Sequence, residues 1–392
     1  MESNASKPGL SGASLAILTP RWGTPSETFI RRHVTSILPG RTVAMSRTIA
    51  DPAWCPDVPL LPIRNRSDFP IDRLARVFGR WRYDRRSRAL RDFLKEHQVT
   101  TVLGEWLNFS AVWFHNIRDL NLRFFAHAHG YDITRKALRH PWYRILYRRL
   151  AHMDGIITFS RLSKERLLGA FPMDPQRVHV IPYGIDVPPA IERREESEII
   201  RCLHVGRMVE KKGRLITLQA FEAAHRDCPR LRLELIGAGP LLEACRRYSR
   251  DHGLAEAVTF HEGRPHAFVK DRLAHADMLL LHSVTAASGD EEGLPVAILE
   301  GMAHALPVIS TLHSGIPEAV LEGQTGRLVT ERDRESMTRA ILELAGQPAL
   351  RSRMGLAGRQ RVLEHFSADQ EIRRLREVLF DENAPSRGVS RR

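Results

Sequence analysis

Cysteine is scarce in this sequence, with four residues among 392, and no two of them form a C-x-x-C pair. So few thiols cannot build a disulfide framework, and their spacing argues against a structural zinc site. We therefore expect buried free thiols and a reducing compartment. The four residues concerned are Cys55, Cys202, Cys228 and Cys245.

Long apolar runs are also missing, because no stretch approaches the roughly 18 residues that a membrane-spanning helix needs. Residues 1–14 are polar and lack a cationic segment followed by an apolar one, so we expect no secretory signal and a cytosolic chain. A hydrophobic content of 43% with 27% charged residues excludes intrinsic disorder, collagen-like repeats and a coiled coil. The length favours two domains rather than one small module.

Acidic residues are fewer than basic residues in only one half of the chain. Residues 1–190 hold 29 Lys and Arg against 16 Asp and Glu, whereas residues 191–392 hold 30 against 30, so the first half carries the whole net charge of +13. Within residues 64–91, ten arginines face three aspartates and are interleaved with aromatic residues. This pattern is typical of a segment that docks on an anionic membrane surface, and a solvated helix face fits it equally well. Nucleic acid would also suit the charge, but we expect no such partner. The membrane patch would comprise Arg80, Trp81, Arg82, Arg85 and Arg86.

Apolar, β-branched runs alternate with amphipathic stretches in both halves, which indicates βα units around parallel sheets. We expect strands at 14–19, 42–46, 99–104, 123–128, 155–159 and 178–182, and again at 199–205, 231–236, 258–261, 277–282, 307–310 and 326–329. We expect helices at 26–37, 72–96, 142–151 and 160–170, and further helices in the second half. The predicted fold class is α/β, with two doubly wound, Rossmann-like domains facing across a cleft and a helical C-terminus.

The same pattern predicts the domain divisions. The expected segments are a disordered N-terminus (1–13), an N-terminal domain (14–188), a linker (189–198), a C-terminal domain (199–365), a helix that returns to the N-terminal domain (366–382) and a disordered tail (383–392).

The stretch GDEEGLPVAILEGMAHALPVIST at 289–311 carries the strongest chemical signal. A loop ends at Glu292, Gly293 permits a ligand to approach the backbone, and Pro295 fits the first turn of a helix. The amides and the dipole at such a helix start suit a diphosphate. Glu292 could accept hydrogen bonds from sugar hydroxyls and Glu300 could take a ribose diol, although two glutamates at this spacing also occur on exposed helix faces.

A second signal is HVGRMVEKKG at 204–213, at the end of a predicted strand. Arg207 at the strand tip and Lys212 at the start of the next helix would bring two cations to one sheet edge. Two fixed cations can stabilise the charge of a departing diphosphate, and a surface cluster is the simpler alternative. Gly237 and Gly239 follow the next strand, but this G-x-G lacks the third glycine of a dinucleotide fingerprint.

The motifs GRMVEKKG, LIGAGP, EGLPVAILE, ALPVIST and SGIPEAV follow one another in the second half. In order and spacing they resemble the donor-binding domain of the family-four retaining glycosyltransferases with the GT-B fold. Weaker matches in the first half are PSETFI at 25–30, HAHGYD at 127–132, TFSRLSKERL at 158–167 and VIPYGID at 180–186. PSETFI and the loop before EGLPVAILE are similar to the branch that builds exopolysaccharides of the colanic acid and amylovoran kind. The resemblance implies an N-terminal acceptor domain and a C-terminal donor domain.

The resemblance also implies roles for individual residues. The catalytic set would be His129, Arg207, Lys212 and Glu292. The donor would be bound by Gly23, Gly206, Gly237, Gly239, Arg264, Pro265, Gly293, Leu294 and Glu300, and Thr24, Ser26 and Asp132 would lie near the acceptor or the sugar. We expect no metal. His127 and His129 alternate on a strand and could bind one, but the sequence shows no third ligand at a suitable spacing. The run Asp290, Glu291, Glu292 could suggest magnesium, but the resemblance implies that cationic side chains and helix amides replace the metal.

The expected function is transfer of a hexose from a UDP- or GDP-sugar to a lipid-linked glycan acceptor, with retention at the anomeric carbon. It would serve exopolysaccharide or related cell-surface polysaccharide synthesis at the inner face of the plasma membrane, without a permanently bound cofactor. Two alternatives stay open: a nucleotide-sugar 2-epimerase of the same architecture, and a non-catalytic basic surface-binding protein on this scaffold.

Overall fold

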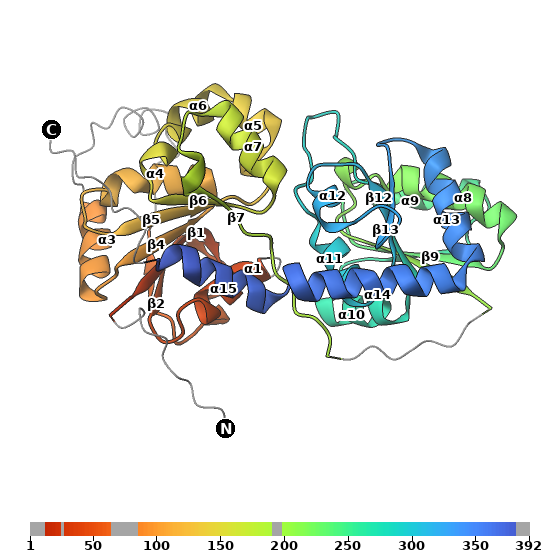
Figure 1. Ribbon diagram of the computed structural model, residues 1–392, viewed down its shortest axis with the longest axis horizontal. Coiled ribbons are helices and arrows are strands. Elements are labelled where there is room, and N and C mark those ends of the chain that lie inside the picture. The colour runs from red at the N-terminus through yellow and green to blue at the C-terminus, as the bar shows by residue number, and fades with distance from the viewer. Residues whose placement is uncertain (1–11, 25–26, 64–84, 190–197, 382–392) are drawn as a thin grey trace. The chain divides into compact units, whose positions relative to one another are not determined.

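The chain divides into two compact units, which the computed structural model describes over residues 12–24, 27–63, 85–189 and 198–381 (Figure 1). Unit 1 comprises Met1–Pro182 and Glu371–Arg392, and unit 2 comprises Tyr183–Gln370. The chain therefore passes between the units twice. The second passage lies within the helix α15 (Ala368–Leu379).

Unit 1 is built on a seven-stranded parallel sheet in the order β3-β2-β1-β4-β5-β6-β7. Its strands are β1 (Leu15–Trp22), β2 (Thr42–Ile49), β3 (Leu60–Pro62), β4 (Thr101–Glu105), β5 (Arg123–His127), β6 (Gly155–Thr158) and β7 (Val178–Val180). Its described helices are α1 (Thr28–Ser36), α3 (Arg85–Glu96), α4 (Leu107–Ile117), α5 (Arg135–Arg139), α6 (Pro141–Tyr147), α7 (Arg161–Ala170) and α15.

The core of unit 1 includes the far C-terminal helix. The first residues of β1 are continuously buried, as expected for a parallel strand covered on both faces. Leu15 and Trp22 from this strand share one hydrophobic cluster with Leu375 and Leu379 from α15. The helix α15 lies beside α1 (Figure 1), where Nε of Arg376 donates to a backbone carbonyl at the end of α1. The C-terminal helix is thus a structural part of unit 1.

Unit 2 is built on a six-stranded parallel sheet in the order β10-β9-β8-β11-β12-β13. Its strands are β8 (Ile200–Val205), β9 (Leu231–Ile236), β10 (Val258–His261), β11 (Met278–Leu281), β12 (Val308–Thr311) and β13 (Gly326–Val329). Its described helices are α8 (Arg214–Asp227), α9 (Leu242–Asp251), α10 (His266–His275), α11 (Val296–Ala303), α12 (Ile316–Ala319), α13 (Arg334–Gly346) and α14 (Pro348–His365).

Each sheet reverses its strand order once, between β1 and β4 in unit 1 and between β8 and β11 in unit 2. Open α/β sheets bind ligands beyond the carboxyl ends of the strands at such a switch point. The loops after β8 and β11 therefore form the expected ligand-binding edge of unit 2.

The predicted α/β class with two Rossmann-like sheets is confirmed, and so are all the predicted strands. The structure adds β3, α4 and α5 in unit 1, which the sequence pattern did not predict. Of the helix predicted at 72–96, α3 confirms the second part, and residues 72–84 lie outside the described residues. The linker residues 190–197 and the terminal segments 1–11 and 382–392 also lie outside them.

The four cysteines are free thiols, and Cys55, Cys202 and Cys245 are buried as expected. The burial prediction is wrong for Cys228, which is half-buried because it follows the last residue of α8 near the surface. Among the described residues, no helix is both long and apolar enough to cross a bilayer.

Candidate functional site

The loop after β8 brings Lys212 to the switch point of unit 2. The strand ends at Val205, and a 3-10 turn spans Glu210–Lys212. Gly213 then adopts φ +58°, and a Cβ at this position would lie 1.7 Å from the carbonyl oxygen of His282. Only glycine therefore allows the β8 loop to lie directly against the end of β11.

Lys212 and Glu292 form the central ion pair. Nζ of Lys212 lies 3.0 Å from Oε2 of Glu292, Nζ of Lys211 lies 3.5 Å from Oε1, and each side chain is 11% exposed. Burial raises the pKa of Glu292, but the two ammonium groups outweigh burial and hold this pKa below its ordinary value. Burial lowers the pKa of Lys212, and Glu292 partly offsets that effect. The site therefore holds an ionised carboxylate between two cations.

Lys211 was missed by the sequence analysis. Its Nζ also lies 3.2 Å from a carboxylate oxygen of Asp290 and donates to the backbone carbonyl of Glu291. The carboxylates of Asp290 and Glu292 are thus paired with ammonium groups, which argues against the magnesium interpretation of this loop. The two consecutive lysines in the motif HVGRMVEKKG were the sequence signal that could have identified Lys211.

Three of the expected glycines form the backbone around this ion pair. Gly206, Gly237 and Gly239 have φ values of 143°, 140° and 150°, and a Cβ on Gly237 would lie 1.8 Å from the carbonyl oxygen of Gly206. Arg214, also missed by the sequence analysis, is fully buried and donates through Nη2 to the carbonyls of Gly206 and Ile236. Burial lowers the pKa of Arg214 to about 10. A buried cation therefore holds the ends of β8 and β9 together.

Arg207 differs from Lys212 in its surroundings. Its side chain is exposed, and among the described residues no carboxylate forms an ion pair with its guanidinium. Its backbone carbonyl accepts a hydrogen bond from Nε of Arg214 at 3.2 Å. The structure thus places two buried cations, Lys211 and Lys212, and one exposed cation, Arg207, on the same loop.

Glu300 lies on α11, which begins at Val296 with Pro295 as its N-cap, so Pro295 directly precedes the helix instead of lying in its first turn. Oε1 of Glu300 lies 2.7 Å from Nε2 of His266 at the start of α10. The hydrogen bond to Glu300 raises the pKa of His266, and burial partly opposes that rise. The expected ribose-binding carboxylate is therefore in contact with an imidazole that the sequence analysis did not select.

The remaining expected residues of unit 2 flank these two helices. Gly293 and the buried Leu294 connect Glu292 to α11. Arg264 and Pro265 are exposed and directly precede α10, and the guanidinium of Arg264 lies over the Phe268 ring.

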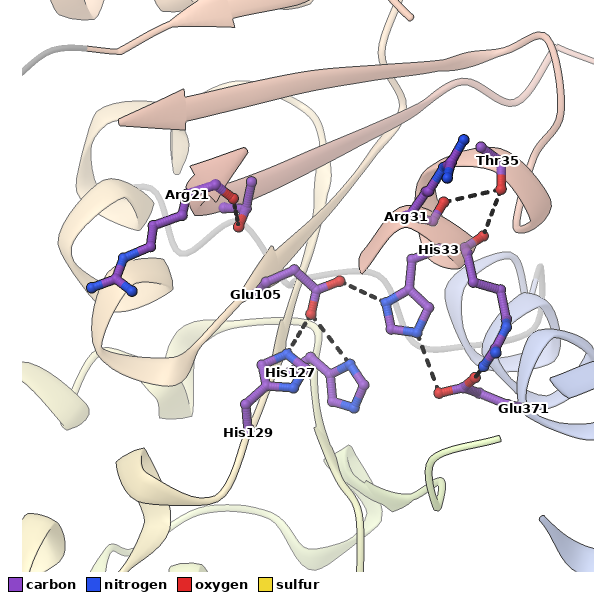
Figure 2. Close-up of polar contacts among 10 residues, drawn as sticks. Arg21, Arg31, His33, Thr35, Glu105, His127, His129 and Glu371 are labelled. Atoms are coloured by element: carbon purple, nitrogen blue, oxygen red, sulfur yellow. Dashed lines mark hydrogen bonds and ion pairs between the residues drawn. The ribbon is translucent and has the colours of Figure 1, made fainter. Parts of the chain in front are cut away.

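Unit 1 carries a buried cluster of charged side chains at the carboxyl ends of β4 and β5, as Figure 2 shows. Glu105 ends β4, and its carboxylate lies 2.7 Å from Nδ1 of His33 and 2.5 Å from Nε2 of His129. Nδ1 of His127 lies 3.4 Å from the same carboxylate. On the other side of His33, Nε2 lies 3.3 Å from the carboxylate of Glu371 on α15. Sequence analysis selected only His129 as functional from this cluster.

The cluster divides its imidazoles into charged and neutral ones. Burial lowers the pKa of His33, but Glu105 and Glu371 outweigh burial and raise it to about 10. Burial lowers the pKa of His129 to about 4, and neighbouring His127 adds to this effect. Burial raises the pKa of Glu105, yet the imidazoles outweigh it and hold this pKa well below its ordinary value. His33 is therefore charged, and His129 is neutral.

The ligand atoms of His33, Glu105 and His127 all lie within 4.8 Å of one another, and imidazole with carboxylate is a donor set that suits zinc. The carboxylates are nevertheless already engaged, since Glu105 pairs with His33 and Glu371 pairs with both His33 and Arg32, the latter at 3.2 Å. Both carboxylates are thus already paired with cations of the protein.

His129 is enclosed by aromatic rings. Its ring stacks on Phe29 with centroids 4.6 Å apart and packs against Trp106 at 4.7 Å. Asp132 is fully buried and accepts hydrogen bonds from the backbone N–H groups of His129 and Leu107. Burial raises the pKa of Asp132 to about 6, although these backbone hydrogen bonds oppose the rise. Asp132 thus fixes the loop of His129 to the start of α4.

The last expected residues follow β1 or belong to the arginine-rich stretch at residues 64–91. Gly23 and Thr24 follow β1 at the switch point of unit 1. Arg85 and Arg86 are the first two residues of α3. The remaining ones lie outside the described residues, namely Ser26, Arg80, Trp81 and Arg82.

Two family models match this chain. A model described as "Glycosyltransferase Family 4" matches residues 17–188, and a model described as "Glycosyl transferases group 1" matches residues 200–347. The chain belongs to the glycosyltransferase family whose two domains these models describe, and it is a glycosyltransferase with the GT-B fold.

Curated relatives agree with this assignment. The chain is 32% identical over 271 residues to the GDP-mannose-dependent alpha-(1-6)-phosphatidylinositol monomannoside mannosyltransferase of Mycolicibacterium smegmatis, covering 66% of this chain and 70% of the relative. It is 31% identical over 254 residues to the amylovoran biosynthesis glycosyltransferase AmsK of Erwinia amylovora, covering 64% and 62%. The predicted resemblance to family-four and exopolysaccharide glycosyltransferases is confirmed.

Solved structures of low sequence identity share the fold. HepE of Anabaena, in complex with UDP, superimposes with a TM-score of 0.75 at 16% identity, covering 93% of this chain and 99% of that chain. Sucrose-phosphate synthase of Thermosynechococcus elongatus gives 0.70 at 17% identity, covering 93% and 97%.

Proposed function

We propose that this chain is a retaining hexosyltransferase that uses a nucleoside-diphosphate sugar as donor and a lipid-linked glycan as acceptor. The observation that carries the proposal is the arrangement of Lys211, Glu292 and Lys212 at the switch point of unit 2. Two ammonium groups at a sheet edge that binds ligands suit a diphosphate, and a carboxylate beside them suits sugar hydroxyls.

The proposed reaction exchanges the partners of this ion pair. A bound diphosphate takes over the ammonium group of Lys212, and the carboxylate of Glu292 then accepts hydrogen bonds from the sugar. The bond from the anomeric carbon to the diphosphate oxygen breaks, and the acceptor oxygen forms its bond on the same face while its proton passes to the departing diphosphate. Lys212 and Arg207 stabilise the leaving group without a metal, and Glu292 orients the sugar.

The relatives support the choice of donor and acceptor. The mycobacterial relative is named for GDP-mannose and for a phosphatidylinositol mannoside acceptor, AmsK is named for amylovoran synthesis, and HepE binds UDP. We therefore propose a GDP- or UDP-sugar donor, an acceptor carried by a lipid, and a role in exopolysaccharide or related synthesis at the inner face of the plasma membrane.

Calorimetry with the free nucleoside diphosphate tests whether Glu300 and Glu292 have the different roles proposed for them. We expect Glu300→Gln to weaken nucleotide binding, because its carboxylate lies on α11 beyond the loop and suits the ribose. Glu292→Gln should not weaken nucleotide binding, because the diphosphate displaces this carboxylate from Lys212, and it should lower sugar transfer. Equal loss of affinity in both variants contradicts the assignment.

A transfer assay separates the proposed function from the alternatives. Release of nucleoside diphosphate that depends on an added lipid-linked acceptor supports transfer. A nucleotide-sugar 2-epimerase would convert the donor without any acceptor, and a non-catalytic binding protein would do neither.

A further inference from the structure

His313 connects the loops that follow three adjacent strands of unit 2. It lies just after β12, and its side chain is 2% exposed. Its Nε2 lies 3.1 Å from the backbone nitrogen of Glu292, in the loop after β11. Its Nδ1 lies 2.6 Å from Oε1 of Glu331, which follows β13.

These contacts determine the tautomer of the ring. A backbone N–H can only donate, so Nε2 of His313 accepts from Glu292 and carries no proton. The ring proton is then on Nδ1, which donates to Glu331. Burial raises the pKa of Glu331, but the hydrogen bonds from His313 and from the backbone N–H of Thr285 outweigh burial and lower it. An ionised carboxylate thus orients a neutral imidazole.

A second hydrogen bond joins the same two loops. The backbone N–H of Gly315 donates to the carbonyl of Gly293 at 3.0 Å, next to the contact between His313 and Glu292. The loop of Glu292 is therefore bound at two successive residues to the loop after β12. The position of the Glu292 carboxylate between Lys211 and Lys212 depends on this loop.

We infer that His313, oriented by Glu331, is the positioning residue for the Glu292 carboxylate. This inference rests on the proposed function, because His313 would position Glu292 for contact with the donor sugar. His313 acts through Glu292, and its removal displaces the carboxylate without removing it. A displacement of this kind costs turnover rather than nucleotide affinity.

The test compares His313→Gln with His313→Asn. The Gln amide oxygen can reach the position of Nε2 and accept from Glu292, whereas Asn reaches only the position of Nδ1. We expect His313→Asn to lower kcat by about tenfold to hundredfold with less than about a threefold change in nucleotide affinity, and His313→Gln to stay within about fivefold of the unmodified protein. Equal kcat values for the Gln and Asn variants overturn the inference.

A double-variant cycle and a readout without activity complete the test. In a Glu292→Gln background, His313→Asn should have little further effect on kcat, and a full additional loss overturns the inference. In the donor-free protein, amide hydrogen exchange of residues 289–294 should accelerate in His313→Asn and not in His313→Gln. If Asn prevents folding, Glu331→Leu replaces it, since it frees the ring and should accelerate the same exchange.

The two proposals fail in different ways. If no donor is used, the proposed function fails. If Glu292→Gln transfers as well as the unmodified protein, the proposed role of Glu292 in transfer fails. In both cases the exchange experiment alone decides the positioning role. If Glu292→Gln is impaired while His313→Asn behaves as the unmodified protein in both assays, the positioning role fails and the proposed function stands.

Discussion

Glu292 lies between two ammonium groups, and its backbone is bound by His313. All these side chains are largely withdrawn from water, so their Coulomb attraction is stronger than that of surface pairs. Removing one partner of such a pair leaves a charge that is poorly compensated. The chemistry of this site is therefore sensitive to single side chains.

We predict that Lys212→Ala and Arg207→Ala each lower turnover by roughly two to three orders of magnitude, because each removes charge stabilisation of the departing diphosphate. Steady-state transfer assays measure the loss, and thermal denaturation should show that folding survives. Arg353→Ala, which removes an exposed arginine on α14, is the matched control and should be neutral. Near-normal turnover in both variants would remove the two cations from the mechanism.

At the scale of elements, α1, β4, β5 and α15 meet at the buried cluster of unit 1. His33 on α1 contacts Glu105 at the end of β4 and Glu371 on α15, and the latter contact spans 338 residues of sequence. The helix α15 therefore contributes both apolar side chains and one buried charge to unit 1. Its attachment should depend on pH.

The folded-state pKa of His33, about 10, lies above its ordinary value of 6.5, so its stabilisation is complete below pH 6.5 and is lost as pH rises toward 10. The pKa values of Glu105 and Glu371 are lowered, so their contribution is present above about pH 4.5 and is lost on acidification. We predict that the free energy of unfolding falls from about pH 7 to about pH 10, and that His33→Gln removes this alkaline slope and costs about 3 to 5 kcal/mol.

Tryptophan fluorescence during urea unfolding of the full chain measures this effect, because all six tryptophans lie in the sequence of unit 1. His140→Gln, which changes an exposed histidine of the same unit, is the control and should keep the slope. A slope that persists in His33→Gln would show that other groups cause it.

At the scale of the whole molecule, charge is distributed unequally along the chain. The first 190 residues carry the entire excess of +13, whereas the remainder balances 30 cations against 30 anions. A soluble acceptor gives no reason for this asymmetry. A lipid-linked acceptor at an anionic membrane surface would explain the asymmetry, because cationic side chains draw a protein toward the lipid headgroups.

We predict that the protein sediments with anionic but not with zwitterionic vesicles at low salt, and that it is released as the Debye length falls below about 8 Å. Changing Arg80, Arg82, Arg85 and Arg86 together to Gln should abolish sedimentation and leave donor binding intact. The matched control removes four exposed arginines of unit 2 and should still sediment: Arg226, Arg230, Arg247 and Arg250. If the two fourfold variants sediment equally, or if the unmodified protein does not bind vesicles, the positive charge is general surface basicity and not a membrane-binding patch.

The elements that the sequence analysis missed have physical explanations. The strand β3 has three residues, follows Pro59 and ends at Pro62, so it offers no alternation to detect. The helix α4 buries Leu107, Ala111 and Phe114 together with further apolar residues, and a helix that is apolar on most sides shows no clear period. The strand β3 forms by pairing with β2 at the edge of the sheet, and α4 forms because it packs against β4 and β5.

The sequence by itself determined the strands, the loops between them, the glycines that allow tight backbone approach and the membership of a family. These features depend on local hydrophobic alternation and local backbone conformation, which neighbouring residues specify. The partners of the functional side chains were decided by tertiary structure alone. Lys212 meets Glu292 across 80 residues because β8 lies next to β11, and His33 meets Glu371 because α15 packs on unit 1. All buried parallel strands present similar apolar patterns, so the sequence of one strand carries little information about which strand lies beside it.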